Sequence, residues 1–111
     1  MGSAYSNVIQ VQLTPAIAAP VLAAAFNANG TAALLSWTEA SGGITGFNLY
    51  RDSNQQGYAL LEVLAPGVFE YQDEIPLDPA SDQNEVSYYL TALAGAASSS
   101  PSNEVANYAR V

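Results

Sequence analysis

The chain contains no cysteine, no histidine and no lysine. Without cysteine there is neither a disulfide bond nor a thiolate metal site, so packing alone must hold the fold. Without histidine the chain lacks the commonest general base and metal ligand, and serine–histidine catalysis is excluded. Arg51 and Arg110 are the only cations, too few to neutralise a phosphate backbone or an anionic lipid surface. We therefore predict that the chain binds neither nucleic acid nor membrane.

Charge of any kind is scarce: only 11% of the 111 residues are charged, and the net charge is −8. Half of the residues are hydrophobic, which suffices for one domain with a single core and argues against a disordered tail. No apolar run is long enough to span a bilayer. The first residues lack the basic region and apolar stretch of a secretory signal, so we expect none.

Apolar and polar residues alternate along several short segments, which are separated by Gly, Pro, Asn and Ser. A period of two residues is typical of strands with one buried face. Pro15 and Pro20 interrupt the alanine-rich stretch that could otherwise form a helix, and Asn29-Gly30 is the strongest turn signal. The predicted strands are 21–26, 31–37, 44–51, 58–64, 68–72, 86–93 and 102–111. This rhythm predicts an all-β fold, a seven-stranded antiparallel β-sandwich of the immunoglobulin-like class.

The alternation also predicts which side chains form the core. Trp37 shares one face of its segment with Ala33 and Leu35, and it is the largest side chain in the chain. We expect it to meet apolar residues of two other segments in the centre of the sandwich. The predicted core residues are Trp37, Phe47, Leu49, Tyr88 and Leu90.

Four short blocks occur in a fixed order: 34–37 (LLSW), 46–51 (GFNLYR), 88–93 (YYLTAL) and 102–105 (SNEV). They resemble the second, third, sixth and seventh strands of a fibronectin type III domain. In that family a tryptophan of the second strand lies at the centre of the core, and Trp37 matches it. The likeness covers residues 20–109. It implies a fibronectin type III domain over 20–111, preceded by an N-terminal arm and linker over 1–19.

One position departs from the family pattern. The family usually begins its sixth strand with a tyrosine whose hydroxyl bonds the preceding corner, and Val86 stands at that position here. Tyr88 and Tyr89 follow instead. We therefore expect the long acidic loop of residues 73–85 to be held by other contacts.

Acidic residues gather between positions 70 and 85, which hold six of the ten carboxylates. Such a cluster can bind Ca²⁺, but its spacing is not that of an EF-hand loop, and Pro76 and Pro79 interrupt it. A solvated loop is the simpler interpretation. Two carboxylates can catalyse glycoside hydrolysis only in a cleft that holds them at a fixed separation, which a small sandwich seldom offers. We expect no metal site, no cofactor, no catalytic residue and no enzyme activity.

Tyrosine is abundant, with seven residues. An exposed tyrosine on a sheet can stack on a sugar ring or anchor a protein interface, whereas ordinary cross-strand packing also favours aromatics. The candidates for exposure are Tyr50, Tyr58, Tyr71, Tyr89 and Tyr108. The segment 95–100 carries neither charge nor aromatic residue and is predicted to be a flexible connector.

The segment 6–13 (SNVIQVQL) resembles the start of the last predicted strand, because both begin Ser-Asn and place a β-branched residue soon after. Ile9, Val11 and Leu13 form one apolar face that needs covering, and Val8 adds a further apolar side chain. The segment can pair with a neighbouring chain by strand addition, it can fold on its own sandwich edge, or it can be a remnant of a tandem array of domains. We expect the arm residues Val8, Ile9, Val11 and Leu13 to bind other protein subunits, further copies of this chain included.

The resemblance implies a non-catalytic structural or interaction module. One hypothesis is a bacteriophage virion component, either a capsid decoration or a tail-associated protein, that attaches through the arm. Release by lysis would make a secretion signal unnecessary. The alternative is a spacer or weak carbohydrate-binding module of a secreted bacterial enzyme or adhesin, with surface glycans as partners. Both hypotheses place the protein on a virion or outside the cell.

Overall fold

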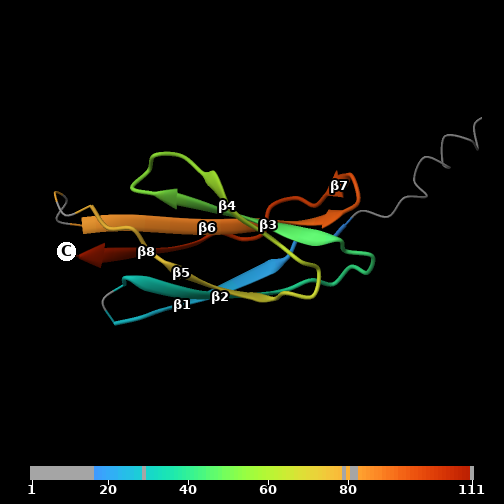
Figure 1. Cartoon of the computed structure of the whole chain (residues 1–111), viewed down its shortest axis with the longest axis horizontal. Helices are drawn as coiled ribbons and strands as arrows, with labels where there is room; N and C mark the ends of the chain where they lie inside the picture. Colours follow the sequence, from blue (N-terminus) through green and yellow to red (C-terminus); the bar gives the residue numbers. More distant parts are fainter. Residues whose placement is uncertain (1–16, 29, 79, 81–82, 111) are drawn as a thin grey trace, which may run out of the picture.

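The computed structural model describes residues 17–28, 30–78, 80 and 83–110. These residues form eight strands in two antiparallel sheets that face each other (Figure 1). The predicted arm residues Val8, Ile9, Val11 and Leu13 lie outside the described residues. The strands are β1 (Val21–Phe26), β2 (Ala32–Thr38), β3 (Gly46–Ser53), β4 (Ala59–Leu64), β5 (Glu70–Glu74), β6 (Gln83–Ala94), β7 (Ala97–Ser98) and β8 (Val105–Arg110).

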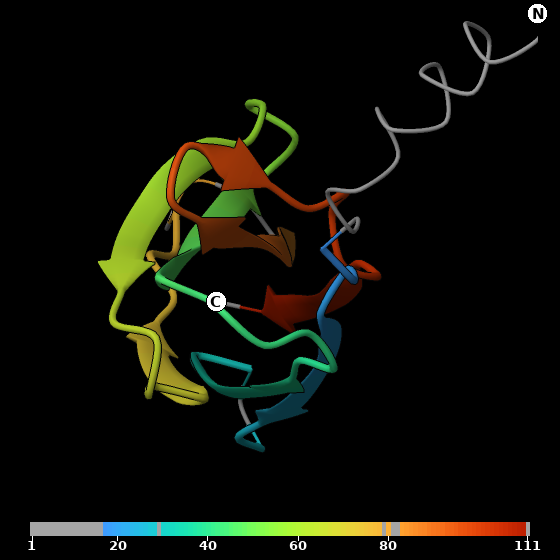
Figure 2. The same ribbon diagram turned by 90° about the vertical axis from the view of Figure 1, so that its right-hand side faces the viewer.

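The smaller sheet has the order β1-β2-β5, and the larger one has the order β4-β3-β6, with β7 and β8 both paired to β6. A view turned by 90° shows the two layers and places β1 beside β8 at one edge (Figure 2). The Asn103 side chain joins the sheets there. Its amide accepts from the Leu22 N–H and donates to the Leu22 carbonyl, both at 2.8 Å. The described residues therefore form an immunoglobulin-like β-sandwich, as the sequence predicts.

The core lies between the sheets and follows the alternation of each strand. Trp37 of β2 meets Phe47 of β3 edge to face, with ring centroids 5.8 Å apart. Leu35, Leu49 and Leu90 are fully buried around them. Burying side chains of this size contributes about 1.5–3 kcal/mol each relative to exposure. The buried apolar cluster consists of Leu22, Ala33, Leu35, Trp37, Phe47, Leu49, Leu64, Ile75, Val86, Tyr88, Leu90 and Ala92.

Two strands have other bounds than the sequence predicts, and this changes the environment of acidic residues. The strand predicted over 68–72 is β5, which runs from Glu70 to Glu74, and β6 begins at Gln83 rather than at Val86. Asp73 therefore belongs to a strand and not to the acidic loop. Because its side chain faces inward, only 5% of the residue is exposed, and the Arg51 guanidinium holds the carboxylate at 2.9 Å. The expectation that Asp73 is solvated in a loop is wrong.

The segment 95–100 is also more ordered than predicted. It contains β7, whose Ala97 and Ser98 pair with Ala94 and Leu93 of β6. Gly95 adopts a φ of 62°, which closes the tight turn between the two strands. The predicted flexible connector is thus the tip of a short hairpin, and the described residues have one strand more than the seven predicted.

Asn84 holds the loop before β6. Its side-chain oxygen accepts from the Asp78 N–H at 2.8 Å and from the Asn54 side chain at 2.9 Å. Asn54 in turn accepts from the Glu85 N–H at 2.7 Å. Val86, at the family's tyrosine position, is simply buried. A pair of asparagine side chains therefore anchors this loop, in place of a tyrosine hydroxyl.

In the described part of the chain, no helix has the length and hydropathy to cross a membrane.

Candidate interaction surfaces

Three tyrosines pack together on the outer face of the larger sheet. Tyr50 of β3 and Tyr89 of β6 are register partners, and their rings stack with centroids 4.7 Å apart. Tyr58, which precedes β4, meets Tyr89 edge to face at 4.6 Å. All three residues are half-buried, although nothing from the opposite sheet covers this face. We call Tyr50, Tyr58 and Tyr89 the tyrosine cluster.

Polar contacts fix Tyr58 across the sheet. Its hydroxyl lies 2.9 Å from Ser87 Oγ and also hydrogen-bonds the carboxylate of Glu104. Burial and the Glu104 hydrogen bond raise the pKa of Tyr58 to about 12. The ring therefore reaches from the start of β4 over β3 to β6 and to the segment before β8, which makes the cluster a rigid part of the surface.

Exposed aliphatic residues continue the cluster along β4. Leu60 is paired with Tyr50 and Val63 with Asn48, so both point to the same outer face. They are 52% and 59% exposed, which is high for large apolar side chains. In the described residues β4 pairs only with β3, so its other backbone edge is open. An open edge with exposed apolar residues is typical of a strand that meets a partner.

Carboxylates border this face. Asp52 lies two positions beyond Tyr50 on β3, and Glu85 lies on β6 opposite the exposed Tyr108 of β8. Glu104 is bound to Tyr58 as described above. The outer face of the larger sheet therefore combines aromatic, aliphatic and acidic groups within a few strand spacings.

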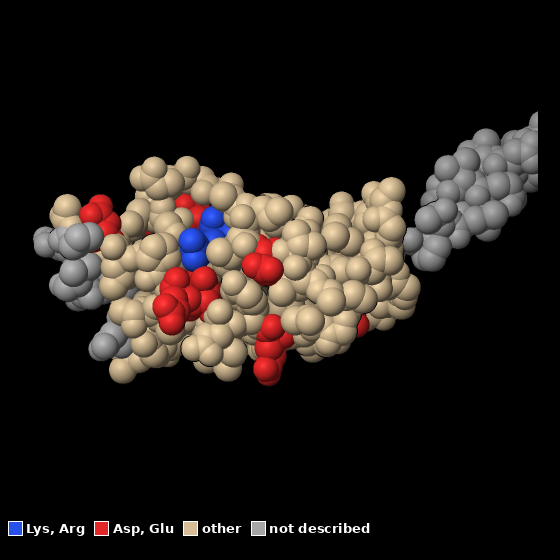
Figure 3. Space-filling model, viewed as in Figure 1, with Lys and Arg blue, Asp and Glu red and all other residues tan. Residues whose placement is uncertain are grey.

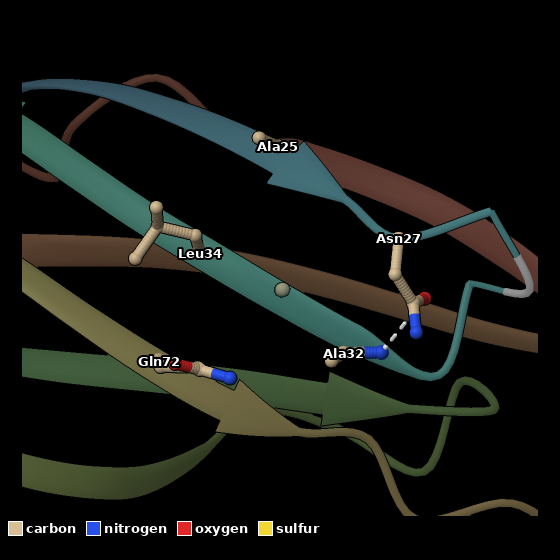
Figure 4. Close-up of a pocket in the computed structure, with 6 residues that line it drawn as sticks. Ala25, Asn27, Ala32, Leu34 and Gln72 are labelled. Carbon is tan, nitrogen blue, oxygen red and sulfur yellow. Dashed lines mark hydrogen bonds between the residues drawn. The ribbon is translucent and has the colours of Figure 1, made fainter.

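The outer face of the smaller sheet is flatter and made of smaller residues. Val21 and Leu34 are its exposed large apolar side chains, and alanines occupy much of β1 and β2 between them. An open hollow of about 230 Å³ lies beside Leu34, where the small side chains of Ala25 and Ala32 leave space next to Gln72 (Figure 4). The lining is mostly apolar, with Asn27 and Gln72 as its polar side chains.

The acidic residues of the described segments do not come together as a group. The described residues contain no group of three or more acidic side chains placed to hold a metal ion. Acidic groups are scattered over the face shown in Figure 3, with one cationic patch among them. Of the six clustered acids in the sequence, Asp73 is turned into the core and bound to Arg51. The calcium alternative therefore loses one of its candidate ligands.

The sequence indicated single tyrosines as candidates for exposure, but it did not predict the ring contacts between them. Tyr108 is exposed, whereas Tyr50, Tyr58, Tyr71 and Tyr89 are half-buried. The alternation along each strand could place Tyr50 and Tyr89 on the outer face. It could not reveal that they are register partners, because strand pairing is a relation between distant segments.

No family profile matches the sequence, and no curated protein matches it. Solved structures do match. An Fn3-like protein from Clostridium thermocellum is 22% identical, with a TM-score of 0.64, over 83% of this chain and 92% of its own. The fibronectin type III domain of human fibronectin type III domain containing protein 3 is 16% identical, with a TM-score of 0.61. This likeness covers 87% of the present chain and 89% of that structure's chain.

A pectate lyase, Pel3 from Pectobacterium carotovorum, is 19% identical with a TM-score of 0.62. This likeness covers 80% of the present chain but only 26% of the lyase. The chain thus spans about a quarter of that enzyme and nearly the whole of the two fibronectin type III structures. These matches show that the described residues have the fibronectin type III fold.

Proposed function

We propose that this chain is a non-catalytic structural and interaction module. The observation that carries the proposal is the contrast between its interior and its surface. Buried polar groups such as Asp73 and Asn84 are bonded to neighbouring side chains and serve the fold. The exposed apolar groups, in contrast, lie on outer sheet faces and on an open edge, where partners dock.

The specific role we propose is that of a bacteriophage virion component, a capsid decoration or tail-associated protein, attached through its N-terminal arm. Residues 1–19 contain no charged side chain, so the full side-chain charge of −8 belongs to residues 20–111. An uncharged strand with apolar Ile9, Val11 and Leu13 meets no electrostatic opposition when it pairs with an acidic neighbour. The partners on this proposal are other subunits of the assembly, copies of this chain included.

Deleting residues 1–13 tests this role. The truncated protein should stay folded, because the sandwich core lies within the described residues, and it should lose assembly or attachment. A full-length variant with Ile9, Val11 and Leu13 changed to Ser should behave in the same way. The matched control changes Gln10 and Gln12 to Ser and should still assemble. Native mass and melting temperature are the readouts. A truncated protein that unfolds, while the intact chain is a monomer, would instead make the arm an intramolecular strand.

The second candidate function is a spacer or weak carbohydrate-binding module of a secreted bacterial enzyme or adhesin. It is favoured by the likeness to a part of a pectate lyase, which covers 26% of that enzyme. Migration through gels that contain polygalacturonate, compared with inert gels, tests the binding form of this candidate. Retardation that disappears when Tyr50 and Tyr58 are changed to Ser would support it over attachment through the arm.

A further inference from the structure

The outer face of the larger sheet combines features of an interaction surface, and it is separate from the arm. Its floor is the tyrosine cluster, in which Tyr89 contacts both other rings and Tyr58 is hydrogen-bonded at its far end. Rings held in this way lose little freedom when a partner packs on them. Preorganised aromatic surfaces are for this reason common at the centres of protein interfaces.

The apolar part of the surface reaches beyond the rings. Leu60 and Val63 stand on the adjacent strand with more than half of their surface exposed, and Tyr108 is similarly exposed on β8. Register pairing places these side chains on one face, across β4, β3, β6 and β8. Leu60, Tyr50 and Tyr89 are register neighbours across β4, β3 and β6, whereas Tyr108 is opposite Glu85, four residues along β6 from Tyr89. A contiguous apolar group over three strands is more than the scattered surface leucines of an ordinary domain.

Carboxylates predominate around this group. Asp52, Glu85 and Glu104 lie on the same face, and the Glu104 carboxylate is bonded to the cluster itself. Of the two cations in the sequence, the Arg51 guanidinium is bound to Asp73 between the sheets, and Arg110 is at the end of β8, paired with Gln83. The excess of carboxylates favours a partner that brings cations. We propose that this face docks a protein that presents arginine or lysine beside aliphatic side chains.

The same charge argues against a second copy of this chain as the occupant. Two copies would bring net charges of −8 together across acidic rims, which costs free energy at an interface. A cationic side chain gains instead from both the carboxylates and the tyrosine rings, since a guanidinium stacks on an aromatic ring. A neutral glycan could hydrogen-bond the carboxylates but has no charge to complement theirs, and the ring surface it needs is partly covered by the other tyrosines.

Binding of short synthetic peptides to the full chain tests the proposal. The probe alternates arginine and leucine, the charge control alternates glutamate and leucine, and a neutral glucose oligosaccharide is the third ligand. Side-chain NMR shifts should localise the arginine peptide to Tyr50, Tyr58, Leu60 and Val63. The affinity should fall steeply with added salt, because the attraction is electrostatic.

A matched pair of variants completes the test. Changing Leu60 and Val63 to Ser should weaken arginine-peptide binding by about tenfold, the size of a central interface contact. Changing Val21 and Leu34 to Ser removes equally exposed aliphatic residues from the other sheet and should leave the affinity unchanged. Equal loss in both variants would overturn the proposal. Equal binding of the glutamate peptide would also overturn it. The same holds for NMR shifts at these residues with the oligosaccharide but not with the arginine peptide, and for dimerisation of the chain through this face.

Discussion

The Tyr88 hydroxyl donates a 2.5 Å hydrogen bond to Oδ2 of Asp73 and so joins the two sheets through the core. Tyr88 lies on β6 and Asp73 on β5, at opposite sides of the sandwich interior. Arg51 Nη1 binds both oxygens of the same carboxylate at 2.9 Å. The charge of Asp73 is thus compensated by one cation and one hydroxyl, the condition under which a buried carboxylate is tolerated.

Changing Asp73 to Asn should destabilise the domain by about 2–3 kcal/mol, because it leaves Arg51 without its counter-charge in a partly buried site. Tyr88→Phe should cost less, about 1–2 kcal/mol, since Arg51 still satisfies the carboxylate. Urea unfolding of the two single variants and of the double variant measures both effects and their coupling. Strictly additive losses would contradict a direct Tyr88–Asp73 interaction.

Trp37→Ala should cost about 3–5 kcal/mol, because it opens a cavity beside Phe47 in the middle of the core. For a domain of ordinary stability that is a large share of the total. Leu34→Ala, three residues earlier on the outer face of the same strand, should cost less than about 1 kcal/mol. Melting temperatures of the two variants give the comparison, and a Trp37→Ala protein as stable as the wild type would refute the core assignment.

Gly46→Ala should destabilise the domain by about 1–3 kcal/mol. A Cβ at this position would stand 2.9 Å from the carbonyl oxygen of Leu64 on the paired strand, and a backbone atom cannot move aside easily. Gly42→Ala is the matched control, since a Cβ there meets nothing within 4 Å. Thermal unfolding of both variants distinguishes a steric need for glycine from a general loss of chain flexibility, which would affect both positions alike.

Stability should fall at alkaline pH. The pKa of Tyr58 is raised to about 12, whereas a tyrosine in the unfolded chain has a pKa of about 10. Between these values the folded chain keeps a proton that the unfolded chain releases, so the stabilisation is complete below about pH 10 and lost as the pH rises through about 12. Burial and the Asp73 hydrogen bond raise the pKa of Tyr88 as well, which acts in the same direction. Tyr58→Phe should make the fall in melting temperature with pH shallower, and an unchanged slope would contradict the assignment.

Divalent metal should not affect stability. The described residues hold no cluster of ligands for an ion, and Asp73 is already bound to Arg51 and Tyr88. Adding a chelator, or millimolar Ca²⁺, should therefore leave the melting temperature unaltered. A rise with Ca²⁺ that disappears in Asp78→Asn would instead show a site in the loop before β6.

The fibronectin type III architecture could be predicted because it depends on patterns within single segments. Alternation placed Trp37, Phe47, Leu49, Tyr88 and Leu90 on inward faces, and all five are buried in one cluster. The candidate surface could be predicted only in part. The sequence named five tyrosines as candidates for exposure, but Tyr71 packs against the core. The stacking of Tyr50 on Tyr89 depends on the register between strands far apart in the sequence.

The amino-acid sequence by itself determined the class of fold, the inward residues and the exclusion of thiol, histidine and polycation chemistry, because composition and a period of two are local properties. Only the tertiary structure decided that Asp73 is a core residue, that Gly46 must lack a side chain and that Tyr50 meets Tyr89. Each of these depends on a partner from another strand. A carboxylate is solvated or buried, and a tyrosine exposed or stacked, according to the group that the fold places opposite it.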